Sequence, residues 1–189
     1  MLTQTKTEAK PRDFVITRVF DAPPDHVWKC FTEPERMKEW FGPKGSVVVA
    51  AKMDLRVGGT YHGAMRGPDG KVMWAKFVYR EIVPPHRLVW EHSFSDEAGG
   101  LTRHPLSASW PLRLLTTVTL QDAPGGKTAL TLTWSPLDAS PQEQSTFDAA
   151  HDGMRGGWAA RSNASTPIWP VTNSVRRVAA HLCRASVIR

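Results

Sequence analysis

The stretch "GTYHGAMRGPDGKVMWAKFVYREIVPPHRLVWEHSF" at residues 59–94 contains three runs in which apolar and polar side chains alternate. The segments "GPDG" (67–70) and "VPPHR" (83–87) interrupt the alternation with residues that favour tight turns. A period of two that breaks at hairpin intervals is typical of antiparallel strands, and no helical segment lies between the runs to make a parallel crossover. The stretch therefore predicts three consecutive strands at residues 59–66, 71–82 and 87–94.

The same period extends along most of the chain. Further strand-like runs occupy residues 46–55, 112–120 and 127–134, with turn signals in "VGG" (57–59) and "APGG" (123–126). An earlier run, "DFVITRVF" (13–20), is β-branched and aromatic enough to be another strand. We therefore expect a curved antiparallel sheet of seven strands. The polar connection at 95–111 is longer than a hairpin needs, which is typical of mobile or functional loops.

Two short helices are predicted between the first two strands. Pro23 and Pro24 open the first helix, because proline is favoured in the first helical turn. The second is expected to start with Thr32 as the N-cap and Pro34 just inside. Both would present aromatic and aliphatic side chains on one face.

A long C-terminal helix is predicted at the end of the globular part. Ser140, Pro141 and Glu143 form the pattern of a capping box with proline at the first helical position. Apolar residues then recur at helical spacing: Phe147, Ala150, Met154 and Trp158. The helix should lie across the concave face of the sheet, whose apolar side needs a cover. The predicted class is α+β.

Six segments in this order resemble a known family: "FDAPPDHVWKCFTEPERMKEWFGPKG", "MDLRVGGTYHGAMRGPDG", "YREIVPPHRLVW", "TTVTL", "GKTALTLTW" and "HDGMRGGW". The chain is similar to the prokaryotic homologues of the activator of the heat-shock chaperone ATPase, within the START-like, helix-grip superfamily called SRPBCC. The similarity covers about residues 14–158. It implies a Bet v-like single domain in which a long helix grips a curved sheet around an interior of variable content.

The resemblance stops after Trp158, where family members continue with a segment like GGTLxRLxxYLA. Reading "AARSNASTPIWP" (159–170) one base out of register, with permitted codons, gives GGTLERLDAYLA. We therefore predict three parts: a flexible segment at 1–12, the domain at 13–158, and an atypical basic tail at 159–189 that is out-of-frame sequence. A genuine lineage-specific tail is the alternative.

Composition and charge indicate which partners and which cellular location to expect. The formal net charge is +6, but five arginines and no acidic residue follow position 158, which leaves +1 for residues 1–158. A nucleic-acid partner is therefore not expected. No N-terminal apolar run and no stretch of some eighteen apolar residues occurs, so we expect neither a signal peptide nor a membrane span. The two cysteines form no disulfide or metal pattern, which favours the cytoplasm.

Motifs for catalysis are absent from the sequence. No nucleophile elbow, phosphate-binding glycine loop, HExxH motif or CxxC pair occurs, and the seven histidines include no pair spaced for a metal. We therefore predict no catalytic residue, metal or cofactor. Cys30 is expected to be a small core residue.

An aromatic-lined cavity is the functional interpretation of the sheet, and ordinary core packing is its alternative. By alternation, His92 shares a strand face with Leu88, Trp90 and Phe94, where its imidazole would be a polar anchor; it could instead lie at a sheet edge or bond to the backbone. The pattern leaves open whether Arg80 and Glu91 face inward. The candidate cavity residues are Tyr61, Met65, Trp74, Phe77, Trp90, His92, Phe147 and Met154.

Three functions follow from this interpretation. The first is non-covalent binding of a small apolar molecule, such as a lipid or an aromatic compound. The second, implied by the family resemblance, is stimulation of a heat-shock chaperone ATPase. The third is an enzyme like the cyclases and dehydratases of related folds, which would need Glu91 or His92 to meet Tyr61 or Tyr79 in the cavity. The sequence does not decide the oligomeric state.

Overall fold

The computed structural model describes residues 12–43, 45–155 and 185–186. Its helices are α1 (Pro24–Thr32), α2 (Pro34–Trp40) and α3 (Pro141–Ala149). Its strands are β1 (Phe14–Phe20), β2 (Val47–Met53), β3 (Thr60–Arg66), β4 (Val72–Val83), β5 (Arg87–Ser95), β6 (Leu101–Thr102), β7 (Arg113–Ala123), β8 (Lys127–Leu137) and β9 (Ala185–Ser186).

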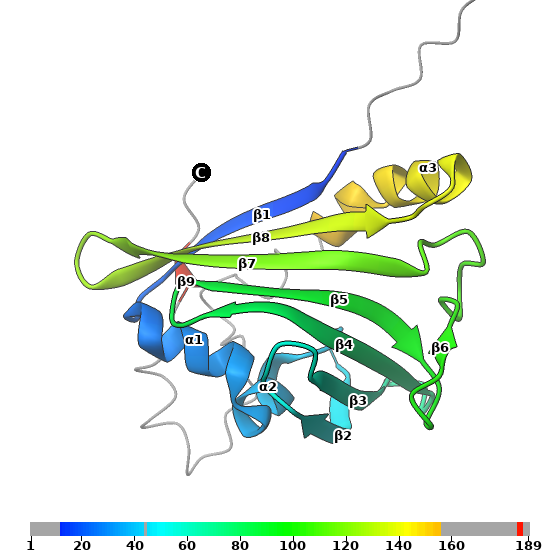
Figure 1. Cartoon of the computed structure of the whole chain (residues 1–189), viewed down its shortest axis with the longest axis horizontal. Helices are drawn as coiled ribbons and strands as arrows, with labels where there is room; N and C mark the ends of the chain where they lie inside the picture. The colour runs from blue at the N-terminus through cyan, green and yellow to red at the C-terminus, as the bar shows by residue number, and fades with distance from the viewer. Residues whose placement is uncertain (1–11, 44, 156–184, 187–189) are drawn as a thin grey trace, which may run out of the picture.

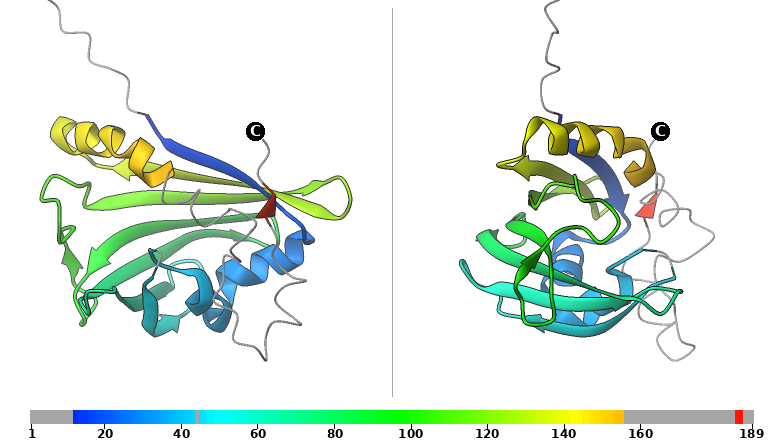
Figure 2. Two further views of the ribbon diagram at one scale, coloured as in Figure 1. Left: turned by 180° about the vertical axis from the view of Figure 1, so that it is seen from behind. Right: turned by 90° about the vertical axis from the view of Figure 1, so that its right-hand side faces the viewer.

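The strands form one antiparallel sheet (Figure 1). Their spatial order is β2-β3-β4-β5-β7-β8-β1-β9, and β6 pairs with β5. The seven longer strands are the seven that the sequence predicts, and the sheet is strongly curved (Figure 2). The short strands β6 and β9 were not predicted, because two residues are too few to show an alternation.

The first strand pairs with the last long strand rather than with the strand that follows it in sequence. β1 pairs with β8 over its whole length, from Phe14 opposite Trp134 to Phe20 opposite Thr128. β2 consequently lies at the other end of the sheet, where Val47 and Val49 are exposed.

Helices α1 and α2 follow the predicted positions, but the junction between them differs. Thr32 is the last residue of α1, and its hydroxyl donates to the Trp28 carbonyl, 2.9 Å away. Glu33 is the residue that precedes α2, and its side chain makes no capping hydrogen bond. The prediction of Thr32 as N-cap is therefore wrong, because its hydroxyl already bonds within the preceding helix.

The start of α3 is confirmed in detail. The Glu143 backbone N–H donates to Ser140 Oγ at 3.3 Å, and the Ser140 N–H donates to Glu143 Oε2 at 2.8 Å, which completes the capping box. The helix spans nine residues to Ala149, and residues 151–155 are again helical. The rest of the predicted long helix, including Trp158, lies outside the described residues.

The core lies on the concave side of the sheet, between the strands and the helices. α1 approaches β7 and β8, while α2 approaches β2. Val27 of α1, Met37 of α2 and Phe147 of α3 are all buried in one apolar cluster with the strands. We call this side of the sheet the inner face. Cys30 of α1 is buried as predicted, at 7% exposure.

The predicted segment 1–12 and the predicted tail 159–189 lie outside the described part of the chain, apart from Arg12 and β9. β9 pairs with β1, Val19 being opposite Ser186. Both segment boundaries stay predictions.

Candidate ligand-binding site

A row of side chains crosses the inner face at right angles to the strands. Strand register places Tyr61, Phe77, His92 and Leu114 directly opposite one another on β3, β4, β5 and β7. The ring centroids of Tyr61 and Phe77 are 4.9 Å apart, and those of Phe77 and His92 are 5.4 Å apart. Because alternate residues of a strand face the same side, Trp90 belongs to the same surface, and its ring centroid lies 5.4 Å from that of Phe77.

The aromatic surface continues toward α3. The ring of His92 lies 5.9 Å from that of Trp134 on β8, and Trp134 lies 5.5 Å from Phe14 on β1. His151, in the helical residues after α3, contacts both Phe14 and Phe147, with centroids 5.5 and 5.0 Å apart. The inner face is thus lined by rings from β3 across the sheet to the C-terminal helical segment.

Three polar atoms of this surface are buried and have no hydrogen-bond partner among the described residues. They are Trp90 Nε1, Thr116 Oγ1 and His151 Nε2. Trp90 and His151 are each 7% exposed, and Thr116 is 0% exposed. Most buried polar groups in proteins are hydrogen-bonded, so three unpaired ones on a single face distinguish it from an ordinary core.

Four titratable side chains of the inner face are held in their uncharged forms. Burial lowers the pKa of His92 from 6.5 to about 4, and it also lowers the pKa of His151. Burial raises the pKa of Tyr61 to about 12 and raises that of Tyr79 as well. Near neutral pH these four groups therefore present neutral imidazoles and phenols.

The structure brings together most of the predicted cavity residues. Tyr61, Phe77, Trp90 and His92 share the inner face as described. Met65 is also on that face, buried at 7% exposure. Its sulfur lies so close to Gly42, whose φ is +106°, that a Cβ at that position would collide with it.

Phe147 is fully buried against Trp110, with ring centroids 5.5 Å apart, and Met154 is partly buried against the same core. Trp74 is different. Register places it opposite Ala64 and Ser95 on the outer face, where its ring stacks on His62 at 4.7 Å. Trp74 therefore does not belong with the inner-face residues. It is an odd number of positions from Phe77 along β4, so the two side chains point to opposite faces of the sheet.

Arg80 and Glu91, whose direction the sequence left open, both lie on the outer face. Arg80 Nη2 donates to Glu91 Oε1 at 2.5 Å, and Arg113 Nη1 donates to Glu91 Oε2 at 3.4 Å. Glu91 is thus separated by the sheet from the two tyrosines that the enzymatic alternative would pair with it. His92 does share a face with Tyr61, but the Phe77 ring lies between them.

Sequence reasoning did not select Phe14, Thr116, Trp134 or His151. Alternation in "FVIT", "LTTVTL" and "LTLTW" does indicate which residues of each strand share a face. It does not say which face is the inner one, and that depends on where the helices pack.

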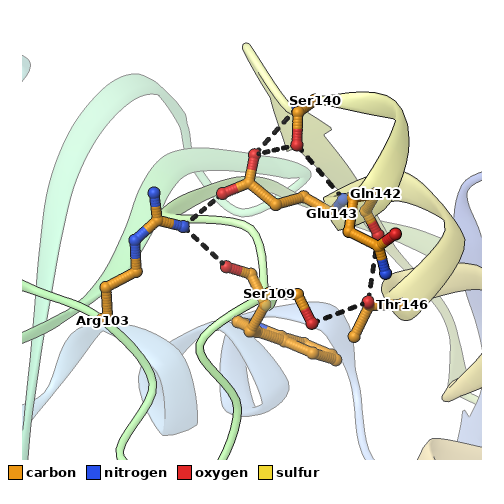
Figure 3. Close-up of polar contacts among 7 residues, drawn as sticks. Arg103, Ser109, Ser140, Gln142, Glu143 and Thr146 are labelled. Atoms are coloured by element: carbon orange, nitrogen blue, oxygen red, sulfur yellow. Dashed lines mark hydrogen bonds and ion pairs between the residues drawn. The ribbon is translucent and has the colours of Figure 1, made fainter.

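A loop is bonded to the first turn of α3, as Figure 3 shows. This loop, residues 96–112, connects β5 to β7 and contains β6. The Arg103 guanidinium donates to the Glu143 carboxylate, and Thr146 Oγ1 donates to Ser109 Oγ at 3.0 Å. The hydrogen bonds from Arg103 and Ser140 lower the pKa of Glu143 to about 2. The loop and the first turn of α3 are therefore joined by side-chain bonds.

Metal-binding clusters and membrane-spanning helices are both absent from the described part of the chain. It contains no group of three or more His, Cys, Asp or Glu side chains that could hold a metal ion. None of its helices combines the length and apolar character that crossing a bilayer requires. The cytoplasmic location stays a prediction. A solvent-open depression between Glu81–Arg87 and Thr119–Asp122 contains none of the predicted site residues.

The geometry can be compared with known families. The family model described as "Activator of Hsp90 ATPase homolog 1-like protein" matches residues 21–162. The chain belongs to this family. The family predicted from the sequence motifs is thereby confirmed, and the match extends four residues beyond Trp158.

Solved structures of bacterial proteins share the fold of this activator-homologue family member. Protein NE0264 from Nitrosomonas europaea is 24% identical, with a TM-score of 0.62 over 80% of this chain and 89% of that one. Protein Ms6760 from Mycobacterium smegmatis is 22% identical, with a TM-score of 0.62 over 82% and 90%. The AHSA1 protein from Silicibacter pomeroyi is 17% identical, with a TM-score of 0.57 over 78% and 90%. No curated protein sequence matches the chain.

Proposed function

We propose that this protein binds a small, largely apolar molecule on the inner face of the sheet, without covalent chemistry. The observation that carries the proposal is the aromatic surface with buried, unpaired polar atoms. Apolar walls with a few polar groups are the usual composition of small-molecule sites.

The unpaired atoms argue against plain core packing. An unsatisfied buried donor or acceptor destabilises a fold by about 1–3 kcal/mol, and Trp90, Thr116 and His151 each contribute one. Phenylalanine or valine at such positions would avoid that penalty. Polar groups in these places are understandable if a ligand supplies their partners.

The electrostatics favour an uncharged ligand. His92 and His151 are held neutral by the burial that lowers their pKa values. Around Trp90 and Thr116 the inner face therefore offers no charged side chain to an ionised molecule, and an unpaired buried charge is strongly unfavourable. The Arg155 guanidinium, 5.7 Å from the centre of the Phe14 ring, is a cation beside the other end of this surface.

Native mass spectrometry of the full chain, incubated with a library of uncharged apolar compounds, tests this function. We expect at least one compound to be retained, and we expect Phe77→Leu to weaken its retention. Trp74→Leu is the matched control, because Trp74 is a large ring on the outer face of the same strand. Failure to retain any compound of the library would overturn the proposal.

A second candidate function is stimulation of a heat-shock chaperone ATPase. It rests on the description of the matching family model as an activator of that ATPase. Titrating the host's Hsp90-type chaperone with the full chain while measuring ATP turnover tests it. A turnover rate that stays constant throughout the titration would remove this candidate.

A further inference from the structure

Two of the residues with unpaired polar groups are neighbours on the inner face. Trp90 on β5 lies directly opposite Thr116 on β7 in the strand register. Directly opposite side chains on one face of an antiparallel pair are in contact range. Trp90 Nε1 and Thr116 Oγ1 are both buried, and neither has a hydrogen-bond partner in the described residues, including each other.

The chemistry of these two groups defines what would satisfy them together. An indole N–H can only donate a hydrogen bond, and a threonine hydroxyl can donate one. A single carbonyl oxygen has two lone pairs and can accept from both. An ammonium group has no lone pair and would leave the indole donor without a partner.

The surroundings of the pair exclude an ionised group. Every neighbour of these two residues on the inner face, within and across the strands, is uncharged: Tyr79, Leu88, His92, Leu114, Val118 and Trp134. Two neutral donors do not compensate the desolvation of a carboxylate, which needs a cation or several donors. The carbonyl would therefore belong to a ketone, quinone or similar uncharged compound.

The neighbouring rings favour a flat molecule. The planes of Phe77 and Trp90 are tilted by 33° at a centroid separation of 5.4 Å, and those of Tyr61 and Phe77 by 30° at 4.9 Å. The rings of Tyr61, Phe77 and Trp90 are thus similarly inclined, whereas the His92 ring stands at 80° to that of Phe77. Aromatic faces pack well against planar, conjugated partners in offset or tilted arrangements.

We propose that the ligand is an uncharged, planar carbonyl compound whose oxygen accepts hydrogen bonds from Trp90 Nε1 and Thr116 Oγ1. This inference rests on the proposed function, since it specifies the chemistry of the same site. It adds a ligand class and two residues that determine specificity.

A matched set of probes tests the ligand class. 9-Fluorenone and fluorene have the same three-ring skeleton and differ at the carbonyl, and fluorene-9-carboxylate replaces it with an anion. Equilibrium dialysis against the full chain gives the three dissociation constants. Each hydrogen bond should increase the affinity about fivefold. Because fluorenone can accept two, we expect it to bind roughly 10- to 30-fold more tightly than fluorene. We expect the carboxylate to bind more weakly than fluorenone.

Variants then test the two residues. Thr116→Val keeps the side-chain shape, Trp90→Phe keeps a smaller aromatic ring, and each removes one donor. Each should therefore reduce the ratio of the fluorenone affinity to the fluorene affinity by about fivefold. Thr128→Val is the matched control. Thr128 is equally buried, but its hydroxyl already donates to the Ala22 carbonyl at 2.6 Å, so the ratio should not change.

The outcomes separate this inference from the proposed function. Three results would each overturn the inference and leave an apolar binding site. They are equal binding of fluorenone and fluorene, preferred binding of the carboxylate, and a ratio of fluorenone to fluorene affinity that is unchanged in Thr116→Val. Binding of none of the three probes, together with no retention of any library compound, would overturn both.

Discussion

Thr116 and Thr128 are chemically identical side chains in equally closed surroundings, and their replacement by valine should have opposite effects. Both are 0% exposed. The Thr116 hydroxyl has no hydrogen-bond partner among the described residues, whereas the Thr128 hydroxyl donates to the Ala22 carbonyl at 2.6 Å. Valine has nearly the same shape as threonine, so the comparison isolates the hydroxyl group.

The magnitudes follow from the cost of an unsatisfied group. Thr116→Val removes an unpaired buried hydroxyl, and the free energy of unfolding should rise by about 1–3 kcal/mol. Thr128→Val leaves the Ala22 carbonyl without that donor, and the free energy of unfolding should fall by about 1–3 kcal/mol. For a chain of this size, each kcal/mol corresponds to roughly 2–4 °C in melting temperature.

Urea unfolding of the unliganded protein, followed by tryptophan fluorescence, measures both effects. The midpoint should move to higher urea for Thr116→Val and to lower urea for Thr128→Val, with an unchanged slope. If Thr116→Val destabilises the protein as much as Thr128→Val does, the Thr116 hydroxyl has a partner. The reasoning that identifies it as a ligand contact would then be refuted.

Three further predictions concern the helix, the core and pH. Ser140→Ala removes the α3 cap and should lower the free energy of unfolding by about 1 kcal/mol, measured by thermal denaturation; an unchanged melting temperature would contradict the capping box. Phe147→Ala should lower it by about 3–5 kcal/mol in urea, against at most about 0.5 kcal/mol for Leu106→Ala, which is 85% exposed; similar effects of the two would count against the described packing. Burial lowers the pKa of His92 from 6.5 in the unfolded chain to about 4, so the unfolded state binds the proton more readily. The free energy of unfolding should therefore fall as the pH drops from about 6.5 to about 4, and His92→Phe should make urea midpoints across this range less dependent on pH.

The positions of the seven longer strands could be predicted because the sequence patterns that indicate strands and turns are local. Alternation and turn residues lie within a few positions of one another, as in the hairpin around Gly125 and Gly126, which both have positive φ. The capping box of Ser140 and Glu143 is equally local, and it is present as predicted.

The site could be predicted only in part, because the direction of a side chain depends on register and on the placement of the helices. His92 and Trp90 were assigned to one face correctly, since they are two residues apart on one strand. The candidate residues from the sequence include both Trp74 and Phe77, which are three positions apart, and in a strand an odd separation puts side chains on opposite faces. The contact of His151 with Phe14 joins residues from the two ends of the domain, which no local pattern reveals.

The bonds between the 96–112 loop and the first turn of α3 have a consequence for local opening of the protein. Arg103 bonds to Glu143 and Thr146 to Ser109, so lifting the first turn of the helix away from the loop breaks both contacts. Backbone amides of the two segments should then exchange with deuterium as one cooperative unit. The side chain of Leu106 in this loop is 85% exposed, so a protease should cut there first, and the cut would free the first turn of the helix from the loop while Phe147 still holds the helix in the core.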